Sequence, residues 1–182
     1  FHKLETMTHS TSLRVKGFTL IEVAAYIAVL GILGVSLTNV LLWSIKTYTK
    51  SQVLQETAWN AQRAMDIMVQ EIREAQGVYN PTTLTSQLSL ATSKYASAGH
   101  TESFIDFFLC AEKVCIKKES QNPVAIMSDN VRVTSLSFVQ VQSSPATKSV
   151  RISMRVEYKN PNNRPEFISQ IELSSAASIR KP

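Results

Sequence analysis

The feature that most constrains the fold of this chain is a long uncharged segment near its beginning. From Val23 to Trp43 the sequence has 21 residues without a charged side chain. As a helix this segment would be about 30 Å long, which matches the hydrocarbon thickness of a bilayer. A buried helix of a soluble protein is rarely this long and this uniform. We therefore interpret the segment as membrane-spanning.

A carboxylate stands directly before this segment, in the stretch KGFTLIEV at residues 16–23, where Glu22 is the acidic residue. A short basic leader containing Arg14 and Lys16 precedes it. A secretory signal has the opposite order, because its small-residue cleavage site follows the apolar region. Taken singly, Gly17 could be a loop glycine, and Glu22 could be an interfacial carboxylate that reaches the headgroups. Together with the leader and the span, they indicate a processing motif.

The stretch KGFTLIEV resembles the processing motif of type IV prepilins and type II secretion pseudopilins. In that family a membrane-embedded aspartyl peptidase cuts after the glycine on the cytoplasmic side and then methylates the new N-terminus. The resemblance implies cleavage between Gly17 and Phe18, followed by N-methylation of Phe18. The remaining residues of the motif are Thr19, Leu20 and Ile21, and Glu22 becomes the fifth residue of the mature chain.

We expect the Glu22 carboxylate to serve assembly and not folding. In the first turn of a helix the macrodipole favours it by only about 0.3–1 kcal/mol. Assembly into a filament would exclude more water, so an unpaired carboxylate would become more costly there. Cleavage frees the amine of Phe18, and on a neighbouring subunit that amine is a cation at the same depth. Glu22 is therefore predicted to select and position the incoming subunit.

The charges on the two sides of the span predict its orientation. Arg14 and Lys16 precede the span and are expected to remain in the cytoplasm. Lys46 and Lys50 follow it and oppose this orientation. Because the leader is short and the resembled family exports its large C-terminal part, we expect the C-terminal part to be extracytoplasmic, anchored in the inner membrane.

Three segments follow from this interpretation. Residues 1–17 form the leader, 18–43 a transmembrane and filament-core helix, and 44–182 an extracytoplasmic pilin-like domain. Because Met7 opens a shorter reading frame, we interpret residues 1–6 as upstream or fragment sequence.

One helix is predicted from about Thr19 to Gln76, because no proline or glycine interrupts residues 35–76. Beyond the span its pattern becomes amphipathic, which predicts that a globular domain covers one face. The residues of this face recur at steps of three or four, and we call them the inner stripe: Ala61, Met65, Met68, Ile72 and Ala75. Gly77 is expected to cap the helix, and Pro81 to block its continuation.

The C-terminal part is predicted to be a β-sheet. Residues 82–103 indicate a loop with one short strand near 88–91, and further strands are expected at 103–109, 114–119, 124–127, 131–141, 150–158 and 166–173. Along 150–158 the apolar residues alternate with polar ones, which places Val150, Ile152, Met154, Val156 and Tyr158 on one face. In the last strand Phe167, Ile171 and Leu173 are expected to face the core. These patterns predict an α+β fold in which one antiparallel sheet packs on the inner stripe, as in the resembled family.

The stretch RAMDIMVQEIREA at residues 63–75 resembles the helix of J-type minor pseudopilins and W-type minor pilins. The ending, with two long strands and a Ser/Ala-rich tail carrying basic residues, is similar to theirs as well. The span contains Asn39 and no proline, which departs from the major-pilin pattern and fits a minor component. The resemblance implies a structural subunit in or at the tip of a type II secretion pseudopilus or type IV pilus. Its implied partners are the prepilin peptidase/methyltransferase, the major subunit and other minor subunits.

Two cysteines, Cys110 and Cys115, flank the residues AEKV. If Leu109 and Ile116 belong to paired strands, the four-residue loop places the cysteines opposite each other, within disulfide reach. An extracytoplasmic location permits their oxidation. Free thiols are an alternative. A metal pair is disfavoured, because zinc takes four ligands and only His100 is near.

The sequence lacks the motifs of the common catalytic sites. It has no Gly-rich phosphate loop, no HExxH and no GxSxG, and His100 is the one histidine after Gly17. We therefore predict a protein that is the substrate of an enzyme and not itself an enzyme, with no cofactor, metal or small-molecule substrate.

Two alternative functions are open at this point. The first is a single-pass membrane protein that displays a binding domain and does not polymerise. The second is a DNA-uptake component, because Arg151, Arg155 and Lys159 are expected on one strand face and could follow phosphates. We interpret that row as a solvated strand face, so nucleic acid is not an expected partner.

Overall fold

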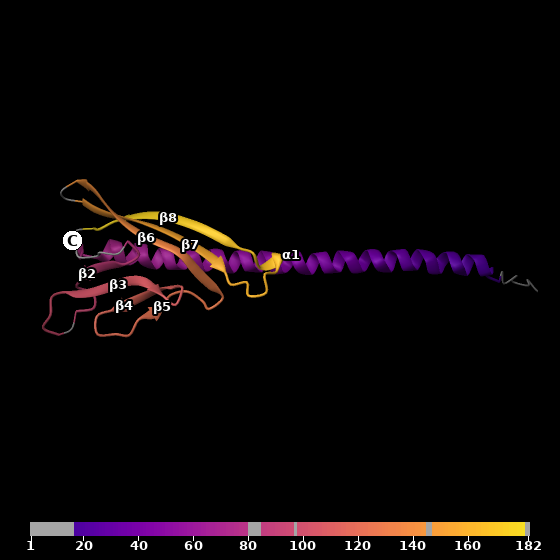
Figure 1. Ribbon diagram of the computed structural model, residues 1–182, viewed down its shortest axis with the longest axis horizontal. Coiled ribbons are helices and arrows are strands. Elements are labelled where there is room, and N and C mark those ends of the chain that lie inside the picture. Colours follow the sequence, from indigo (N-terminus) through magenta and orange to yellow (C-terminus); the bar gives the residue numbers. More distant parts are fainter. Residues whose placement is uncertain (1–16, 80–84, 97, 145–146, 181–182) are drawn as a thin grey trace, which may run out of the picture. The chain divides into compact units, whose positions relative to one another are not determined.

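Figure 1 shows the computed structural model, which describes residues 17–79, 85–96, 98–144 and 147–180, without the side chains of 142–148. These residues form two compact units, of which the first ends at Ser44 and the second begins at Ile45. A single helix, α1 (Leu20–Glu74), continues from the first unit into the second. The expected leader, apart from Gly17, lies outside the described residues, as does Pro81.

The described residues of the first unit are the beginning of α1 and the three residues before it. All of its described residues are exposed, and the helix is long and apolar enough to cross a membrane by length and composition. Two polar side chains of its apolar segment bond to the helix backbone. Thr38 donates to the carbonyl of Gly34 at 2.9 Å, and Asn39 donates to that of Val35 at 3.0 Å. Such bonds satisfy polar groups within the helix, as an apolar solvent would require.

In the second unit α1 buries one face. The predicted inner stripe is confirmed, because all five of its residues are buried and Ala61, Met68 and Ile72 have no exposed surface. The buried face also extends toward the N-terminus beyond the predicted stripe, through Val53 and Thr57.

The C-terminal end of α1 differs from the prediction. The helix ends at Glu74, and Gly77 does not cap it but begins a short strand, β1 (Gly77–Val78). The backbone N–H of Gln76 donates to the carbonyl of Ala91 at 2.8 Å. The chain therefore leaves the helix because its backbone already pairs with a neighbouring strand.

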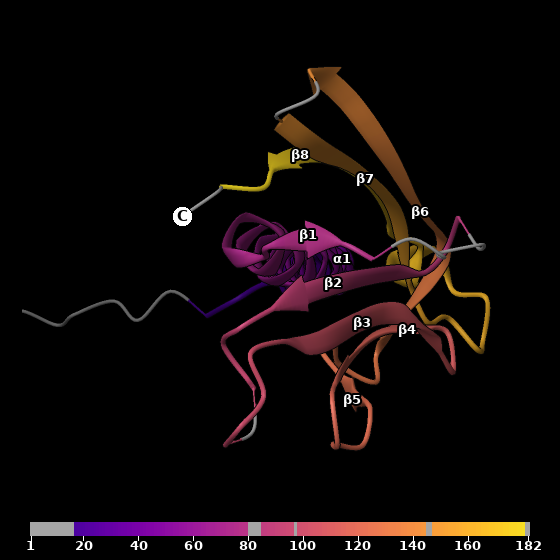
Figure 2. The same cartoon turned by 90° about the vertical axis from the view of Figure 1, so that its left-hand side faces the viewer.

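Two antiparallel sheets follow α1 (Figure 2). The first contains β1, β2 (Leu88–Thr92), β3 (Ser103–Cys110), β4 (Lys113–Lys118) and β5 (Val124–Ala125), in that order. The second contains β6 (Val131–Ser144), β7 (Thr147–Tyr158) and β8 (Gln170–Ser178). The prediction of one sheet is wrong, because alternation along a strand reports which face is buried and not which strands pair.

The start of the last strand also differs from the prediction. Residues Pro165–Phe167 form a 3₁₀ helix, η1, and β8 begins only at Gln170. Proline has a fixed φ that suits the first turn of a helix and has no N–H to donate to a strand. Phe167 therefore lies outside the sheet, where its ring stacks on that of Tyr158 with centroids 6.0 Å apart.

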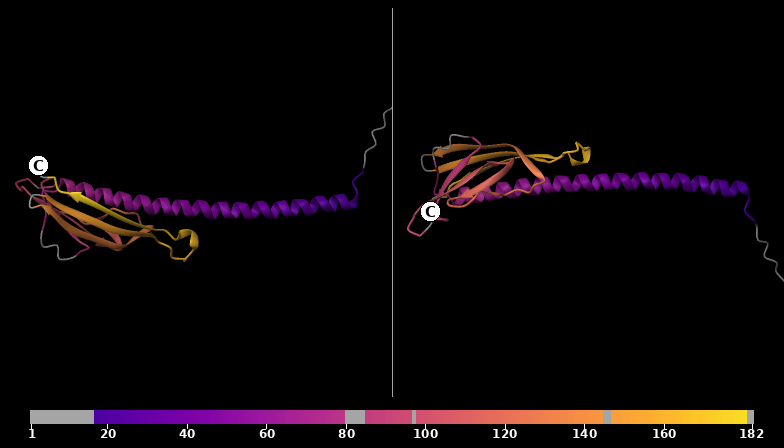
Figure 3. Two further views of the ribbon diagram at one scale, coloured as in Figure 1. Left: turned by 90° about the horizontal axis from the view of Figure 1, so that it is seen from above. Right: turned by 60° about the horizontal axis from the view of Figure 1, so that its bottom comes forward.

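Both sheets pack on the inner stripe to form one core. The alternation predicted for β7 is confirmed at four of five positions: Val150, Ile152, Met154 and Val156 are buried, and Tyr158 is half-buried. Ile171 and Leu173 of β8 pack against this core as partly buried residues. Figure 3 shows from two further directions that the strands of the second sheet run along one side of α1.

Candidate processing and assembly site

The residues of the motif meet at the beginning of α1. Gly17, Phe18 and Thr19 precede the helix, and Leu20 is its first residue. The peptide bond between Gly17 and Phe18 therefore lies in non-helical backbone, and Phe18 is 72% exposed. Backbone that is not tied into a helix leaves its N–H and C=O groups free to bind another molecule.

The fold itself has no need for glycine at position 17. A Cβ atom added to Gly17 would meet no atom within 4 Å, and the residue does not have a positive φ. A Cβ atom here would therefore disturb none of the residues that the structure describes. A requirement for glycine would have to come from a partner that approaches the backbone closely.

Thr19 caps the helix, a contact that sequence reasoning missed. The backbone N–H of Glu22 donates to Oγ1 of Thr19 at 3.3 Å and to its carbonyl at 3.1 Å. The T-x-x-E spacing from Thr19 to Glu22 is that of a capping box. This spacing is visible in the sequence and could have revealed the start of the helix at Leu20.

The Glu22 carboxylate has a neutral partner one turn along the helix. The hydroxyl of Tyr26 donates to its Oε1 at 3.3 Å, and the ring of Tyr26 meets that of Phe18 edge-on, with centroids 6.2 Å apart. Phe18, Glu22 and Tyr26 thus form one exposed cluster. In the part of the chain that the structure describes, no cation pairs with Glu22. A cationic partner would therefore have to come from elsewhere.

Cys110 and Cys115 are joined as a disulfide, with Cα atoms 5.8 Å apart. This distance lies within the usual range for disulfides. Burial differs between the two residues, because Cys115 is 2% exposed whereas Cys110 is half-buried. Oxidation of the pair in the cell remains a prediction.

The hairpin that carries the cysteines has a different register from the expected one. Leu109 pairs with Val114 and not with Ile116, so the loop shortens to Ala111 and Glu112. These two residues have positive φ angles of 47° and 62°. Positive φ at both central residues is typical of a two-residue type I′ hairpin turn. The cysteines are therefore diagonal across the hairpin and not directly opposite.

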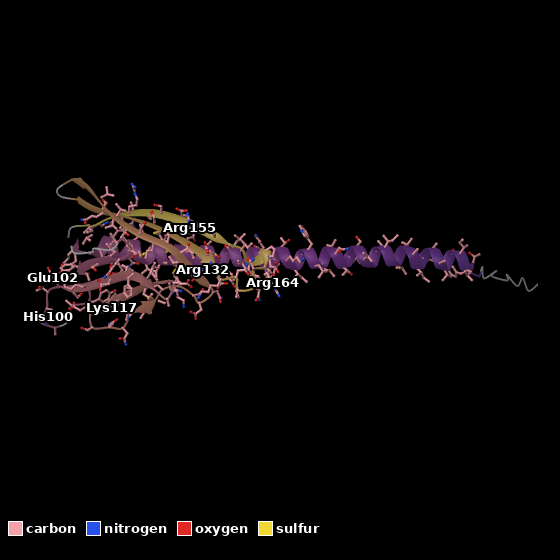
Figure 4. All side chains as sticks on the ribbon, in the orientation of Figure 1. His100, Glu102, Lys117, Arg132, Arg155 and Arg164 are labelled. Carbon is pink, nitrogen blue, oxygen red and sulfur yellow. A yellow bond between two sulfur atoms is a disulfide. The ribbon has the colours of Figure 1, made fainter. Side chains whose placement is uncertain are left out.

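The predicted row of cations on β7 is interrupted. Arg155 pairs with Glu172 of β8, with Nη2 and Oε2 2.9 Å apart, and this hydrogen bond raises the pKa of Arg155. Lys159 follows the end of β7 and does not belong to the strand. In Figure 4 the labelled Arg132 and Arg155 lie on β6 and β7, and Arg132 pairs with Glu157. Acidic partners thus neutralise much of the charge on this face.

Comparison of the chain with protein-family models, with curated proteins and with solved structures gives no match. The fold is α+β, with one long apolar N-terminal helix and two antiparallel sheets. Within the described ranges, no group of three or more histidine, cysteine or acidic side chains is placed to hold a metal ion.

Proposed function

We propose that this protein is a minor pilin or pseudopilin. It is a structural subunit that is cut between Gly17 and Phe18, N-methylated at Phe18, and added to a type II secretion pseudopilus or type IV pilus, in the filament or at its tip. The proposal depends on one observation: the contiguous stretch KGFTLIEV runs into α1, which begins at Leu20, and the 21 residues of this helix from Val23 to Trp43 are uncharged.

The exposed surface of α1 supports both a membrane-bound and an assembled state. Leu20, Ile32 and Leu41 are 88%, 72% and 63% exposed. Apolar surface of this extent is unfavourable in water and needs either lipid or other apolar helices around it. The inner membrane supplies the lipid before assembly, and neighbouring subunits supply the apolar helices afterwards. The unit from Ile45 onward is then extracytoplasmic.

The uncompensated charge of the Glu22 carboxylate supports the assembly step. Its partner within the described chain is the neutral hydroxyl of Tyr26, which does not compensate its charge. The amine freed by cleavage at Phe18 of a neighbouring subunit is a cation and would pair with it. Charge compensation of this kind matters most where assembly excludes water.

The partners follow from these two steps. The prepilin peptidase/methyltransferase acts on the residues around Gly17, so the chemistry belongs to that enzyme and this chain is its substrate. The major subunit and other minor subunits then contact α1. We assign no cofactor and no small-molecule substrate to this chain.

The proposal is tested with the full chain, tagged at its C-terminus, in cells that carry the matching filament system. Processing, membrane insertion and the amount of chain in sheared filaments are measured for the parent and for Glu22→Ala. We expect Glu22→Ala to be cut and inserted normally, while its incorporation falls by at least about tenfold, because a buried pair is broken.

The matched control is Tyr26→Phe, which removes the hydroxyl bonded to Glu22 but keeps the carboxylate. This variant should incorporate like the parent. If Glu22→Ala incorporates as well as the parent, the carboxylate has no role in assembly. If the parent is neither cut nor found in filaments, a membrane-anchored binding module that does not polymerise is the better description.

A further inference from the structure

The loop between β7 and β8, residues 159–169, contacts α1 shortly after the uncharged segment ends. Nζ of Lys50 donates to the carbonyl of Pro165 at 3.5 Å. Lys50 follows Trp43, the last residue of that segment, by seven positions, and both residues belong to α1. Seven residues cover about 10 Å along a helix. The loop, although more than a hundred residues away in sequence, therefore meets α1 near the end of the apolar segment.

The charged side chains around this contact are mostly cations. Residues 45–50 and 159–169 hold one acid, Glu166, and four basic residues: Lys46, Lys50, Lys159 and Arg164. Three of these cations, Lys46, Lys50 and Arg164, are exposed, and none of the four belongs to an ion pair with another residue that the structure describes. The region therefore presents a net positive charge to its surroundings.

An ordered turn presents Arg164. The side-chain oxygen of Asn160 accepts a hydrogen bond from the backbone N–H of Arg164 at 2.9 Å, and Nδ2 of Asn160 donates to the carbonyl of Arg164 at 2.8 Å. The Arg164 backbone is therefore held in place while its side chain remains exposed. Figure 4 shows Arg164 and Glu102 at opposite ends of the second unit.

An exposed apolar side chain accompanies these cations. Ile168 is 58% exposed, whereas the residues on either side of it are held inward: Phe167 stacks on Tyr158, and Ser169 is 5% exposed. The packing of its neighbours thus keeps Ile168 at the surface. Cations beside an exposed apolar side chain fit a bilayer surface, where the cations meet phosphates and the apolar group reaches the acyl boundary.

The short distance along α1 brings this region within reach of a membrane that the helix spans. The headgroup layer extends about 5–8 Å beyond the hydrocarbon, and the attraction between charges persists over about 8 Å more at physiological ionic strength. Lys50, about 10 Å beyond the apolar segment, lies inside this range, and Lys46 lies closer. Because the region is positively charged, an anionic surface complements it.

We propose that the β7–β8 loop, together with Lys46 and Lys50, binds the anionic phospholipid headgroups of the membrane that α1 spans, with Arg164 on a phosphate and Ile168 at the acyl boundary. This inference rests on the proposed function, because a spanning α1 places the loop at the membrane. It gives a role to Lys46 and Lys50, which oppose the expected orientation of the span. It also gives the subunit a membrane-docked state before it joins a filament.

The test uses the full chain in vesicles of phosphatidylcholine, with or without phosphatidylglycerol. A photoreactive phenylalanine analogue replaces Ile168 or, as the matched control, Val124 of β5, which is 59% exposed. Mass spectrometry measures the yield of phospholipid adducts. The Ile168 position should give at least about fivefold more adducts in the anionic vesicles, the factor that one basic residue near an anionic surface contributes, and raised salt should remove this gain. Val124 should give none.

Two results of this experiment would overturn the proposal. Equal adduct yields at Ile168 and Val124 would mean that the loop has no special proximity to the membrane. Equal yields at Ile168 in the two kinds of vesicle would mean that anionic headgroups do not hold the loop there.

The role of Arg164 is tested with the photoreactive group kept at Ile168. Arg164→Gln should lower the adduct yield by about fivefold in the anionic vesicles and leave it unchanged in phosphatidylcholine. Arg151→Gln is the matched control, because Arg151 is also exposed and belongs to no ion pair within the described ranges. Both variants should melt like the parent. Equal effects of the two substitutions would contradict a specific role of Arg164.

Cells that lack the major subunit distinguish lipid from an acidic protein surface. The chain with the photoreactive group at Ile168 is expected to form phospholipid adducts in this envelope. Adducts to a protein in place of phospholipid would overturn the proposal.

Membrane insertion and processing are measured in the cell samples to separate the two proposals. A chain that inserts and is cut after Gly17, but gives no lipid adducts at Ile168, overturns this inference alone. A chain that does not insert overturns the proposed function, and this inference with it. A chain that inserts and gives the adducts but is never cut overturns the proposed function and supports this inference.

Discussion

The side-chain oxygen of Asn60 accepts a hydrogen bond from the backbone N–H of Ser128 at 2.8 Å, across 68 positions of sequence. One turn earlier on α1, Glu56 accepts a hydrogen bond from Nδ2 of Asn130 at 2.7 Å. Ser128 and Asn130 belong to the segment between β5 and β6, which connects the two sheets. Two polar side chains of α1 thus hold the connection between the sheets against the helix.

Loss of the Asn60 side chain is therefore expected to destabilise the second unit. Asn60→Ala leaves the Ser128 N–H, in a half-buried position, without its acceptor, which should lower the free energy of unfolding by about 1–3 kcal/mol. Urea unfolding of the full chain in detergent measures the change. Gln62→Ala, on the exposed side of the same helix, is the control and should stay within about 0.5 kcal/mol of the parent. Equal stabilities of the two variants would contradict this role of Asn60.

The Cys110–Cys115 disulfide is expected to be oxidised in protein isolated from the envelope. Its sequence separation of 5 residues closes a short loop, so reduction should lower the free energy of unfolding by at most about 2–3 kcal/mol. The double variant Cys110→Ser, Cys115→Ser should melt like the reduced parent and should not respond to reductant. Two thiols open to alkylation in unreduced protein would show that the pair is not oxidised there.

Tyr158 is expected to make stability fall at alkaline pH. Burial, with a smaller contribution from Glu56, raises the pKa of its phenol above the ordinary value of 10.0. In the folded protein the neutral phenol is favoured. The contribution of the neutral Tyr158 phenol to the free energy of unfolding is therefore fully present below pH 10.0. It is lost as the pH rises through the higher pKa of the folded state.

The variant Tyr158→Phe isolates this effect, because it keeps the ring and removes the titrating group. Unfolding free energies of parent and variant are compared from neutral pH to above 10.0. The parent should lose stability relative to the variant over the alkaline part of this range. Parallel curves of unfolding free energy against pH for the two proteins would mean that Tyr158 has the same pKa in the folded and unfolded states.

Local patterns in the sequence predicted the helix and the faces of the strands. The apolar run and the period of the inner stripe located α1 to within two residues at either end, and alternation identified the buried residues of β7. Strand pairing depends on contacts between distant segments, so the division into two sheets was not predictable from alternation. The turn at Ala111 and Glu112 also gave no signal, because neither residue is a glycine or an asparagine that favours positive φ.

The candidate site was predictable in part. The motif identified Gly17, Phe18 and Glu22 by resemblance, but the cap formed by Thr19 was missed although its spacing is visible.

The final prediction concerns the variant Gly17→Val, which should block processing without affecting the fold. A Cβ atom added at position 17 meets no atom of the described residues within 4 Å, so the melting temperature of the full chain should equal that of the parent. The peptidase is expected to need close approach to the backbone at this position, so the variant should keep its leader. Gly31→Val is the control, since a Cβ there also meets no atom within 4 Å and the residue lies outside the motif.

The most direct measurement is the mass of the N-terminal peptide of the native protein taken from assembled filaments. If the chain is a processed pilin or pseudopilin, this peptide begins at Phe18 and carries one additional methyl group on its amine. The Gly17→Val variant, isolated from the membrane fraction, still contains the leader. An intact leader on the parent protein in the same filaments would contradict the proposed function.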